Sequence, residues 1–196
     1  MITKQKNKII VVTGIPGSGK TTILTRAMKH LKTQNINYTH LSFGTEMFEI
    51  AKKEGIIKTR DQLRKIDTET QKKIQVKASK QIVKMSKKTN IVFDTHATIK
   101  TPKGYLIGFP EWVVKEIRPD ILVIMEATPK EIHHRRQNDK TRTRDHETEE
   151  AIEEHQMMNR SATIVSGTMS GSTINIIKNR HNKINDAVNE LVEVMK

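Results

Sequence analysis

The chain has no cysteine, which excludes disulfide bonds, thiolate metal sites and a cysteine nucleophile. Aromatic residues are also scarce, at four Phe, two Tyr and one Trp in 196 residues. Few rings are therefore available on which the bases of a single-stranded nucleic acid would stack. No apolar run approaches the length that spans a bilayer, and the polar residues 1–7 lack the apolar core of a signal peptide. We therefore expect a cytoplasmic protein without a membrane segment.

The charge of the chain is strongly one-sided. Thirty-five Lys and Arg against 22 Asp and Glu leave a net charge of +13, which favours anionic partners. One interpretation is a nucleic acid, bound along its phosphate backbone. The other is a nucleotide site that uses several Arg, together with a solvated basic surface. We favour the nucleotide site because the chain shows no recognisable nucleic-acid-binding motif, and an incidental affinity for RNA stays open.

Five short apolar runs predict strands, and helical patterns separate most of them. This alternation is typical of an α/β fold, so we expect a five-stranded, mainly parallel sheet flanked by helices. At 196 residues the chain is expected to form a single domain. The predicted strands are residues 8–13, 38–43, 90–94, 120–126 and 173–177.

Helices are predicted by apolar residues at three- and four-residue steps. The pattern places one helix at residues 23–31 and another at 182–195. A long helical insertion, residues 60–88, lies between the second and third strands, with a break expected at 68–70.

A phosphate-binding loop follows the first strand. Residues 14–21 match the spacing G-x-x-x-x-G-K-[ST] between a strand and a helix, and a chance Gly-rich turn is the weaker alternative. The glycines allow successive N–H groups to face phosphate oxygens, Lys20 is predicted to reach the β- and γ-phosphates, and the Thr21 hydroxyl to bind Mg²⁺. The predicted ATP-binding residues are Gly14, Ile15, Pro16, Gly17, Ser18, Gly19, Lys20, Thr21 and Thr22.

Asp94 ends the third predicted strand, where a parallel sheet presents residues to a ligand. A carboxylate there is predicted to hold the water ligands of Mg²⁺, although an Asp after a strand is also a common turn former. His96 has two possible roles, a hydrogen bond to a phosphate or the orientation of Asp94, and a lone His is more often structural.

An Arg-rich segment, residues 135–145, follows the fourth strand and its helix. Arg136, Arg142 and Arg144 are predicted catalytic residues of a closing flap, because Arg neutralises the charge of a phosphoryl group in transfer. A solvated basic loop is the alternative. Arg135 is predicted to serve the helix surface instead.

Arg60 and Arg64 lie one helical turn apart at the start of the insertion. They are placed to grip a monophosphate from one helix face. A solvated helix face in a Lys-rich segment is an equally simple explanation of their spacing.

With these motifs the chain resembles the nucleoside monophosphate kinases, and most closely the archaeal-type adenylate kinases. The similar segments extend through most of the chain, so the resemblance is more specific than a phosphate loop alone. They are residues 14–22, 43–48, 60–65, 94–96, 100–106, 142–145 and 155–160.

The resemblance implies the reaction MgATP + AMP ⇌ 2 ADP without a covalent intermediate, with Mg²⁺ as cofactor. It implies a single kinase domain, residues 1–196, with an AMP-binding helical insertion at about 44–88 and a short lid at about 136–146. Family members include trimers, so it also implies a homotrimer.

The resemblance also implies site residues. Phe43, Gly44 and Thr45 would line the acceptor nucleotide near Arg60 and Arg64. Residues 178–180 would approach the adenine of ATP through their backbone.

One position departs from the pattern of bacterial and eukaryotic adenylate kinases, which place an Arg after a Gly-Phe-Pro near the acceptor phosphate. Here Glu111 follows residues 108–110. Lys100 and Lys103 therefore join Arg60 and Arg64 as candidates to bind that phosphate.

Three alternatives remain open: a kinase for another nucleoside monophosphate such as CMP or UMP, a different small-molecule kinase with the same loop, and an RNA-associated ATPase. The first differs from an adenylate kinase only in its contacts with the acceptor nucleotide.

Overall fold

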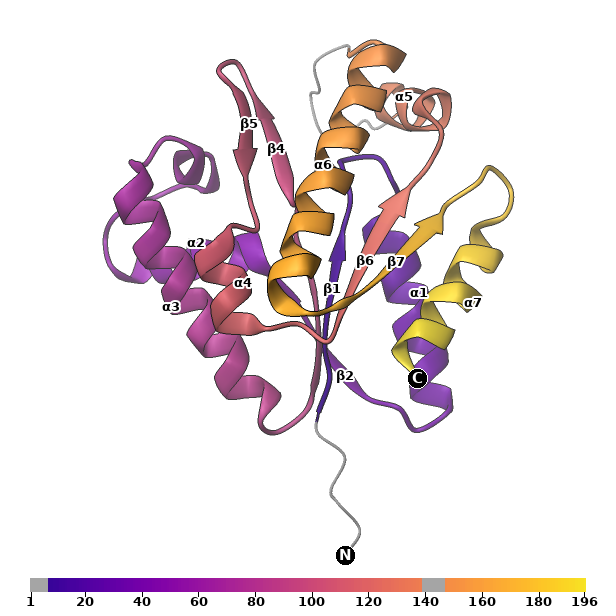
Figure 1. Cartoon of the computed structure of the whole chain (residues 1–196), viewed down its shortest axis with the longest axis horizontal. Coiled ribbons are helices and arrows are strands. Elements are labelled where there is room, and N and C mark those ends of the chain that lie inside the picture. The colour runs from indigo at the N-terminus through magenta and orange to yellow at the C-terminus, as the bar shows by residue number, and fades with distance from the viewer. Residues whose placement is uncertain (1–6, 139–146) are drawn as a thin grey trace, which may run out of the picture.

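The computed structural model describes residues 7–138 and 147–196, with Arg64 described by its backbone alone. Helices and strands alternate along most of the chain (Figure 1). None of the helices in these two ranges combines the length and apolar character needed to cross a bilayer. The elements are β1 (Ile9–Thr13), α1 (Lys20–Thr33), β2 (Tyr38–Ser42), α2 (Phe43–Lys53), the 3₁₀ helix η1 (Arg60–Arg64), α3 (Thr68–Ser86), β3 (Asn90–Asp94), β4 (Thr98–Thr101), β5 (Gly104–Ile107), α4 (Glu111–Ile117), β6 (Ile121–Glu126), α5 (Pro129–Gln137), α6 (Glu149–Ser170), β7 (Thr173–Lys178) and α7 (Ile184–Met195).

The central sheet has five strands in the order β2-β3-β1-β6-β7. Every neighbouring pair is parallel, which confirms the predicted fold class. Because the strands are parallel, their carboxyl ends meet at one edge of the sheet, the usual place for a ligand in such folds. The antiparallel hairpin β4–β5 stands apart from this sheet and was not predicted.

The two faces of the sheet belong to separate hydrophobic clusters, because successive side chains of a strand point to opposite faces. On β1, Ile9 and Val11 pack in the cluster that contains α2, α3 and α4. Ile10 and Val12 pack on the other face, in the cluster of α1 and α7. The domain therefore has three layers, with helices on both sides of the sheet (Figure 1).

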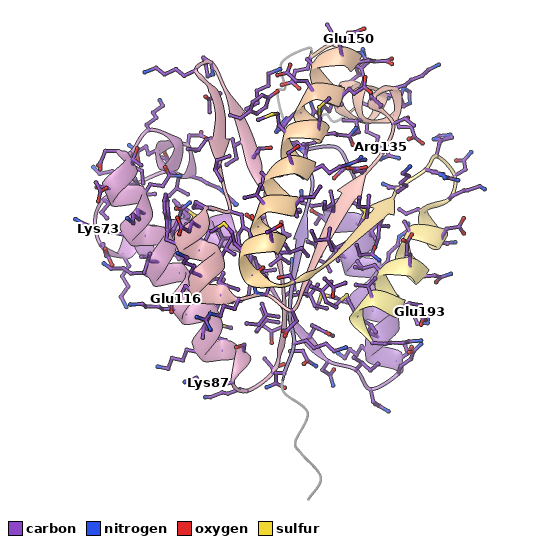
Figure 2. All side chains as sticks on the ribbon, viewed as in Figure 1. Lys73, Lys87, Glu116, Arg135, Glu150 and Glu193 are labelled. Atoms are coloured by element: carbon purple, nitrogen blue, oxygen red, sulfur yellow. The ribbon has the colours of Figure 1, made fainter. Side chains whose placement is uncertain are left out.

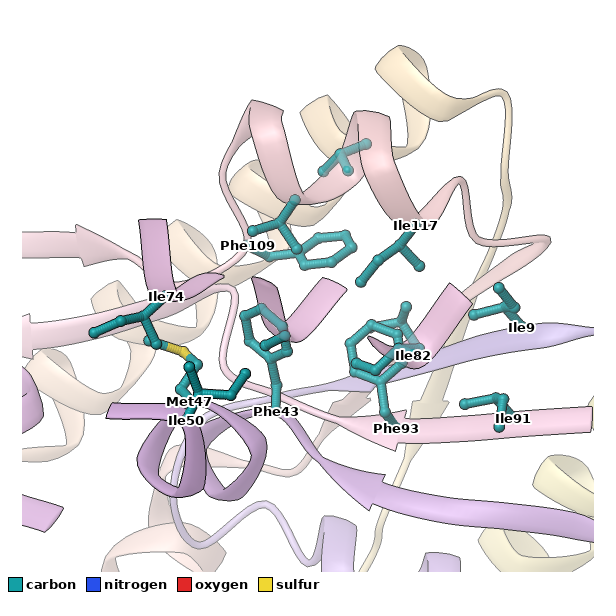
Figure 3. Packing of buried hydrophobic residues seen from close by; sticks show 14 of the residues in the cluster. Ile9, Phe43, Met47, Ile50, Ile74, Ile82, Ile91, Phe93, Phe109 and Ile117 are labelled. Atoms are coloured by element: carbon teal, nitrogen blue, oxygen red, sulfur yellow. The ribbon is translucent and has the colours of Figure 1, made fainter. Parts of the chain in front are cut away.

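Aromatic packing fixes the start of α2 and the loop before α4 against the sheet. The ring of Phe93 on β3 lies 5.9 Å from that of Phe43 and 6.1 Å from that of Phe109, measured between centroids. Figure 3 shows these rings among the aliphatic side chains of α2 and α3. This packing holds residues 43 and 44 beside the carboxyl end of β3.

Two predicted elements need correction. Phe43 does not end β2 but begins α2. The predicted helix 60–88 is two helices, η1 and α3, and they separate before the predicted break at 68–70. The break has a local cause, since the Asp67 side chain accepts a hydrogen bond from the Thr70 N–H at 2.9 Å and so caps α3.

Candidate active site

A cavity of about 720 Å³ opens at the carboxyl edge of the sheet. This volume is within the range of small-molecule sites. The phosphate loop lies on one side, and α2, η1 and α3 lie on the other. The lining residues include Ile15, Pro16, Gly17, Ser18, Gly19, Lys20, Thr21, Thr22, His40, Ser42, Phe43, Gly44, Met47, Arg60, Gln71, Gln75, Asp94, Thr95, His96, Ile99, Gly108 and Arg135.

The phosphate loop, residues 14–21, has a backbone that only glycine adopts readily at three places, Gly14, Gly17 and Gly19. Gly14 has φ +153° and Gly19 has φ +91°, both positive. Space is restricted as well: a Cβ at Gly14 would clash with the backbone oxygen of Met125, and one at Gly19 with the amide nitrogen of Asn179. Gly19 is also the N-cap of α1, so the positive end of that helix lies at the loop.

Side chains from outside the loop bind its carbonyl oxygens. Arg136 donates to Pro16 O through Nε and Nη2, at 2.9 and 2.7 Å. Asn179 Nδ2 donates to Ser18 O at 2.9 Å. Because the N–H of a trans peptide points away from its C=O, the N–H groups of Gly17 and Gly19 are directed away from these donors. The loop is therefore arranged to bind an anion before any ligand arrives.

Lys20 and His96 share one acceptor. Lys20 is buried, and its Nζ donates to Gly14 O at 2.8 Å. His96 Nδ1 lies 2.7 Å from the same oxygen, so Nδ1 carries the proton. Burial, with the nearby charge of Lys20, lowers the pKa of His96 to about 3. His96 is therefore neutral at pH 7, and it contacts the loop rather than Asp94.

Asp94 is paired with a residue that the sequence analysis did not single out. His40 Nε2, on the neighbouring strand β2, lies 2.8 Å from Asp94 Oδ1. Burial alone would raise the pKa of Asp94, but the hydrogen bond from His40 and the charge of Lys20 outweigh it and lower the pKa. An ionised carboxylate therefore faces the cavity. Only the pairing of β2 with β3 brings His40 to this position.

Of the residues predicted to bind the acceptor nucleotide, some line the cavity and others do not. Phe43, Gly44 and Arg60 line the cavity, and a Cβ at Gly44 would lie 3.1 Å from Arg60 Nη2. Thr45 follows Gly44 on α2 but does not line the cavity. The side chain of Arg64 lies outside the described part of the chain.

Lys100 and Lys103 lie on the hairpin and do not line the cavity. Lys100 Nζ is 3.9 Å from Glu147 Oε1, and Lys103 is exposed at the turn between β4 and β5. Glu111 begins α4, where it is exposed and forms an ion pair with Lys115. The structure thus separates these three residues from the cavity.

The Arg-rich segment is only partly described, since Arg142 and Arg144 lie outside the described residues. The prediction that Arg135 serves the helix surface is wrong. Arg135 lies on α5 near the carboxyl ends of β6 and β7 (Figure 2). Its Nη1 is 3.4 Å from Gly17 O, and its Nη2 donates to Asn179 O at 3.1 Å. Arg136 Nη1 in turn donates to Glu147 Oε2 at 2.6 Å.

Comparison with known proteins agrees with this architecture. A family model described as an AAA domain matches residues 13–153. In solved structures the fold resembles that of shikimate kinase from Bacteroides thetaiotaomicron, with a TM-score of 0.59 and 14% identity over 96% of this chain and 98% of that one.

Sequence relatives are much closer. An adenylate kinase from Methanocaldococcus jannaschii is 52% identical and covers 97% of this chain and 100% of the relative. An adenylate kinase from Methanococcus aeolicus is 49% identical over 97% and 99% of the two chains. Similarity at this level along nearly the whole length leaves no room for an unrelated kinase that shares only the phosphate loop. The chain belongs to the archaeal adenylate kinases.

Proposed function

We propose that this adenylate kinase transfers the terminal phosphoryl group of ATP to AMP by in-line displacement, giving two ADP. One observation carries the proposal beyond family membership. A single cavity has an anion-binding loop on one side and, on the other, a basic residue, an apolar wall and amide side chains. Two nucleotides with their phosphates turned toward each other match this arrangement.

The proposed mechanism relies on positioning and electrostatics. The loop N–H groups and the end of α1 bind the ATP phosphates, and Lys20 leaves Gly14 O to bind the transferring group. The AMP phosphate is already ionised at pH 7, so no strong general base is needed, in accord with a neutral His96. Arg136, Arg142 and Arg144 complete the proposed catalytic set by neutralising charge as the lid, residues 136–146, closes.

The cavity also suits Mg²⁺, which prefers oxygen ligands and keeps several waters. Thr21 and Asp94 both line the cavity, and the lowered pKa of Asp94 keeps its carboxylate ionised. We propose that Thr21 binds the ion directly and Asp94 through water. When bound, Mg²⁺ would neutralise phosphate charge. Across the described residues no three His, Asp or Glu side chains form an all-protein metal site.

For the acceptor we propose the helical insertion, residues 44–88, as the AMP-binding region. Its support is the position of Phe43, Gly44 and Arg60 at the cavity. Thr45, Arg64, Lys100 and Lys103 stay predictions, and the two Lys would have to move toward the cavity when substrate binds.

Substrate class is tested by incubating the enzyme with MgATP and each nucleoside monophosphate in turn, and by separating the products chromatographically. We expect rapid formation of ADP with AMP and much slower transfer to CMP, UMP and GMP. Equal or better turnover of CMP would overturn the proposal for AMP and leave a kinase of another monophosphate. ATP hydrolysis without any transfer would exclude both.

We also propose that the chain assembles with copies of itself as a homotrimer. Large apolar side chains are exposed along one stripe of α6, including Met157 at 61% and Val165 at 58% exposure. The others on this stripe are Met158, Ile164 and Met169. An exposed apolar stripe of this kind is typical of an interaction surface, and a further copy of the chain is the partner we propose.

Val165→Glu is expected to yield monomers, because assembly would bury a carboxylate in an apolar contact. Sedimentation equilibrium of the variant and the wild type at the same concentration measures this. Lys87→Gln, an exposed change at the end of α3 (Figure 2), lowers the net charge by one as Val165→Glu does, so it is the charge-matched control and should leave the assembly unchanged. A monomeric wild type, or a trimeric Val165→Glu variant, would contradict the proposed surface.

A further inference from the structure

Gln75 on α3 is a buried polar residue at the acceptor side of the cavity. It is 2% exposed and belongs to the cavity lining. Its Oε1 accepts a hydrogen bond from Trp112 Nε1 at 2.8 Å. No described residue accepts a hydrogen bond from its Nε2. Nε2 is not enclosed by protein atoms, so it is accessible from the cavity, where water or a ligand atom accepts its hydrogen bond.

Trp112 determines which end of the Gln75 amide faces the cavity. An indole N–H only donates, so the group turned toward it must be the amide oxygen. Trp112 itself is half-buried on α4 and does not line the cavity. The N–H groups of Gln75 are therefore left on the cavity side.

The surroundings of Gln75 suit a nucleobase. Phe43 and Met47, both buried, come from α2 and lie in the same cluster as α3 (Figure 3). Gln71 lies one turn earlier on α3 and also lines the cavity. Apolar side chains with a few oriented polar groups are typical of ligand pockets.

We propose that Gln75, oriented by Trp112, is a specificity-determining residue that donates a hydrogen bond to the base of the acceptor nucleotide. This assignment rests on the proposed function and deepens it. A donor held in one place requires an unprotonated acceptor on the base. Adenine offers N1, N3 and N7. Guanine also has unprotonated N3 and N7 but carries a proton on N1, and uracil carries one on N3, so a donor that reaches N1 is the one that favours adenine over guanine. Trp112 acts through Gln75 and is a positioning residue.

Gln75→Met removes the donor and keeps the length of the side chain. We expect KM and Kd for AMP to rise about 10- to 100-fold, with kcat and the KM for ATP within about twofold. Steady-state kinetics and calorimetric titration with AMP measure these constants. Gln81→Met is the matched control, because Gln81 is an exposed residue of the same helix. It should leave every constant unchanged.

Trp112→Phe keeps a ring but removes the N–H that orients Gln75. We expect a smaller increase in KM for AMP than in Gln75→Met, with reduced discrimination between AMP and the other monophosphates. If the role of Trp112 is merely structural, Trp112→Phe should lower the stability of the protein and leave unchanged the ratio of kcat/KM for AMP to kcat/KM for the other monophosphates.

AMP analogues that carry CH in place of N1, N3 or N7 identify the acceptor atom without any variant. Wild type should lose about 10- to 100-fold in kcat/KM with one of them only. Gln75→Met should show no further loss with that analogue, since donor and acceptor form one pair.

The outcomes separate the two proposals. Failure of the wild type to phosphorylate AMP would overturn the proposed function and this assignment together. Transfer to AMP with an unchanged KM in Gln75→Met would overturn this assignment alone. So would equal tolerance of all three analogues by the wild type, which also decides the matter should Gln75→Met fail to fold.

Discussion

Lys20→Ala is expected to lower kcat by about 1,000-fold or more, which is about 4 kcal/mol of transition-state stabilisation. Lys20 is the buried cation of the phosphate loop, held at Gly14 O and 3.4 Å from His96 Nδ1. His96 is neutral at pH 7, so this neighbour brings no charge that would replace that of Lys20 on the transferring group. Alanine at position 20 leaves the loop backbone in place, together with the hydrogen bonds that Arg136 and Asn179 donate to it, so the fold should be retained.

A coupled assay of ADP formation measures the loss, and circular dichroism with thermal unfolding checks the fold. Lys29→Ala is the control, because Lys29 is exposed on the same helix, and its kcat should stay within about twofold of wild type. A decrease of less than tenfold for Lys20→Ala, about 1.4 kcal/mol, is incompatible with the proposed role.

Gly14→Ala is expected to damage both stability and ATP binding. Its Cβ would overlap with the backbone oxygen of Met125, on β6, and that oxygen cannot move as a flexible side chain can. We expect a loss of about 2–4 kcal/mol in the free energy of unfolding. Affinity for ATP should decrease about 100-fold or more, because Gly14 O anchors both Lys20 and His96.

Gly55→Ala separates crowding from backbone strain. Gly55 also has a positive φ, +70°, but a Cβ there meets nothing within 4 Å. Its substitution should cost about 1 kcal/mol, the ordinary penalty of a left-handed residue, and leave ATP binding intact. Chemical unfolding and calorimetric titration with ATP compare the two variants. Equal stability of Gly14→Ala and Gly55→Ala would show that contact with Met125 is unimportant.

The parts of the fold that sequence predicted well have strong local signals. The run at residues 90–94 is apolar between polar ends, and β3 has these bounds. The phosphate loop is recognisable because its spacing and its place between a strand and a helix depend only on neighbouring residues. The hairpin β4–β5 was missed because each strand has only four residues. Pro102 and Gly104 did carry a signal, since they suit the second and fourth positions of a turn.

The parts of the site that sequence could not predict depend on contacts between distant elements. His40 and Gln75 show no motif, and each acquires its role from a partner on another element, Asp94 and Trp112 respectively. Arg135 was assigned to the wrong place for the same reason. Its helix pattern says only that it lies on α5, whereas the packing of α5 beside the phosphate loop decides what it binds.

The side chains that donate hydrogen bonds to the phosphate loop affect when, during folding, the loop becomes complete. They follow three different strands in the chain: His96 comes after β3, Arg136 is on the helix after β6, and Asn179 comes after β7. Asn179 is 161 residues from its acceptor, Ser18. The residues of the motif are neighbours in the sequence, but the side chains that hold the loop come from distant parts of the chain. In a chain whose last strand has not yet joined the sheet, the loop would lack the hydrogen bond from Asn179. Competence to bind ATP would arise late, and bound ATP would in return protect the edge strand β7 from local unfolding.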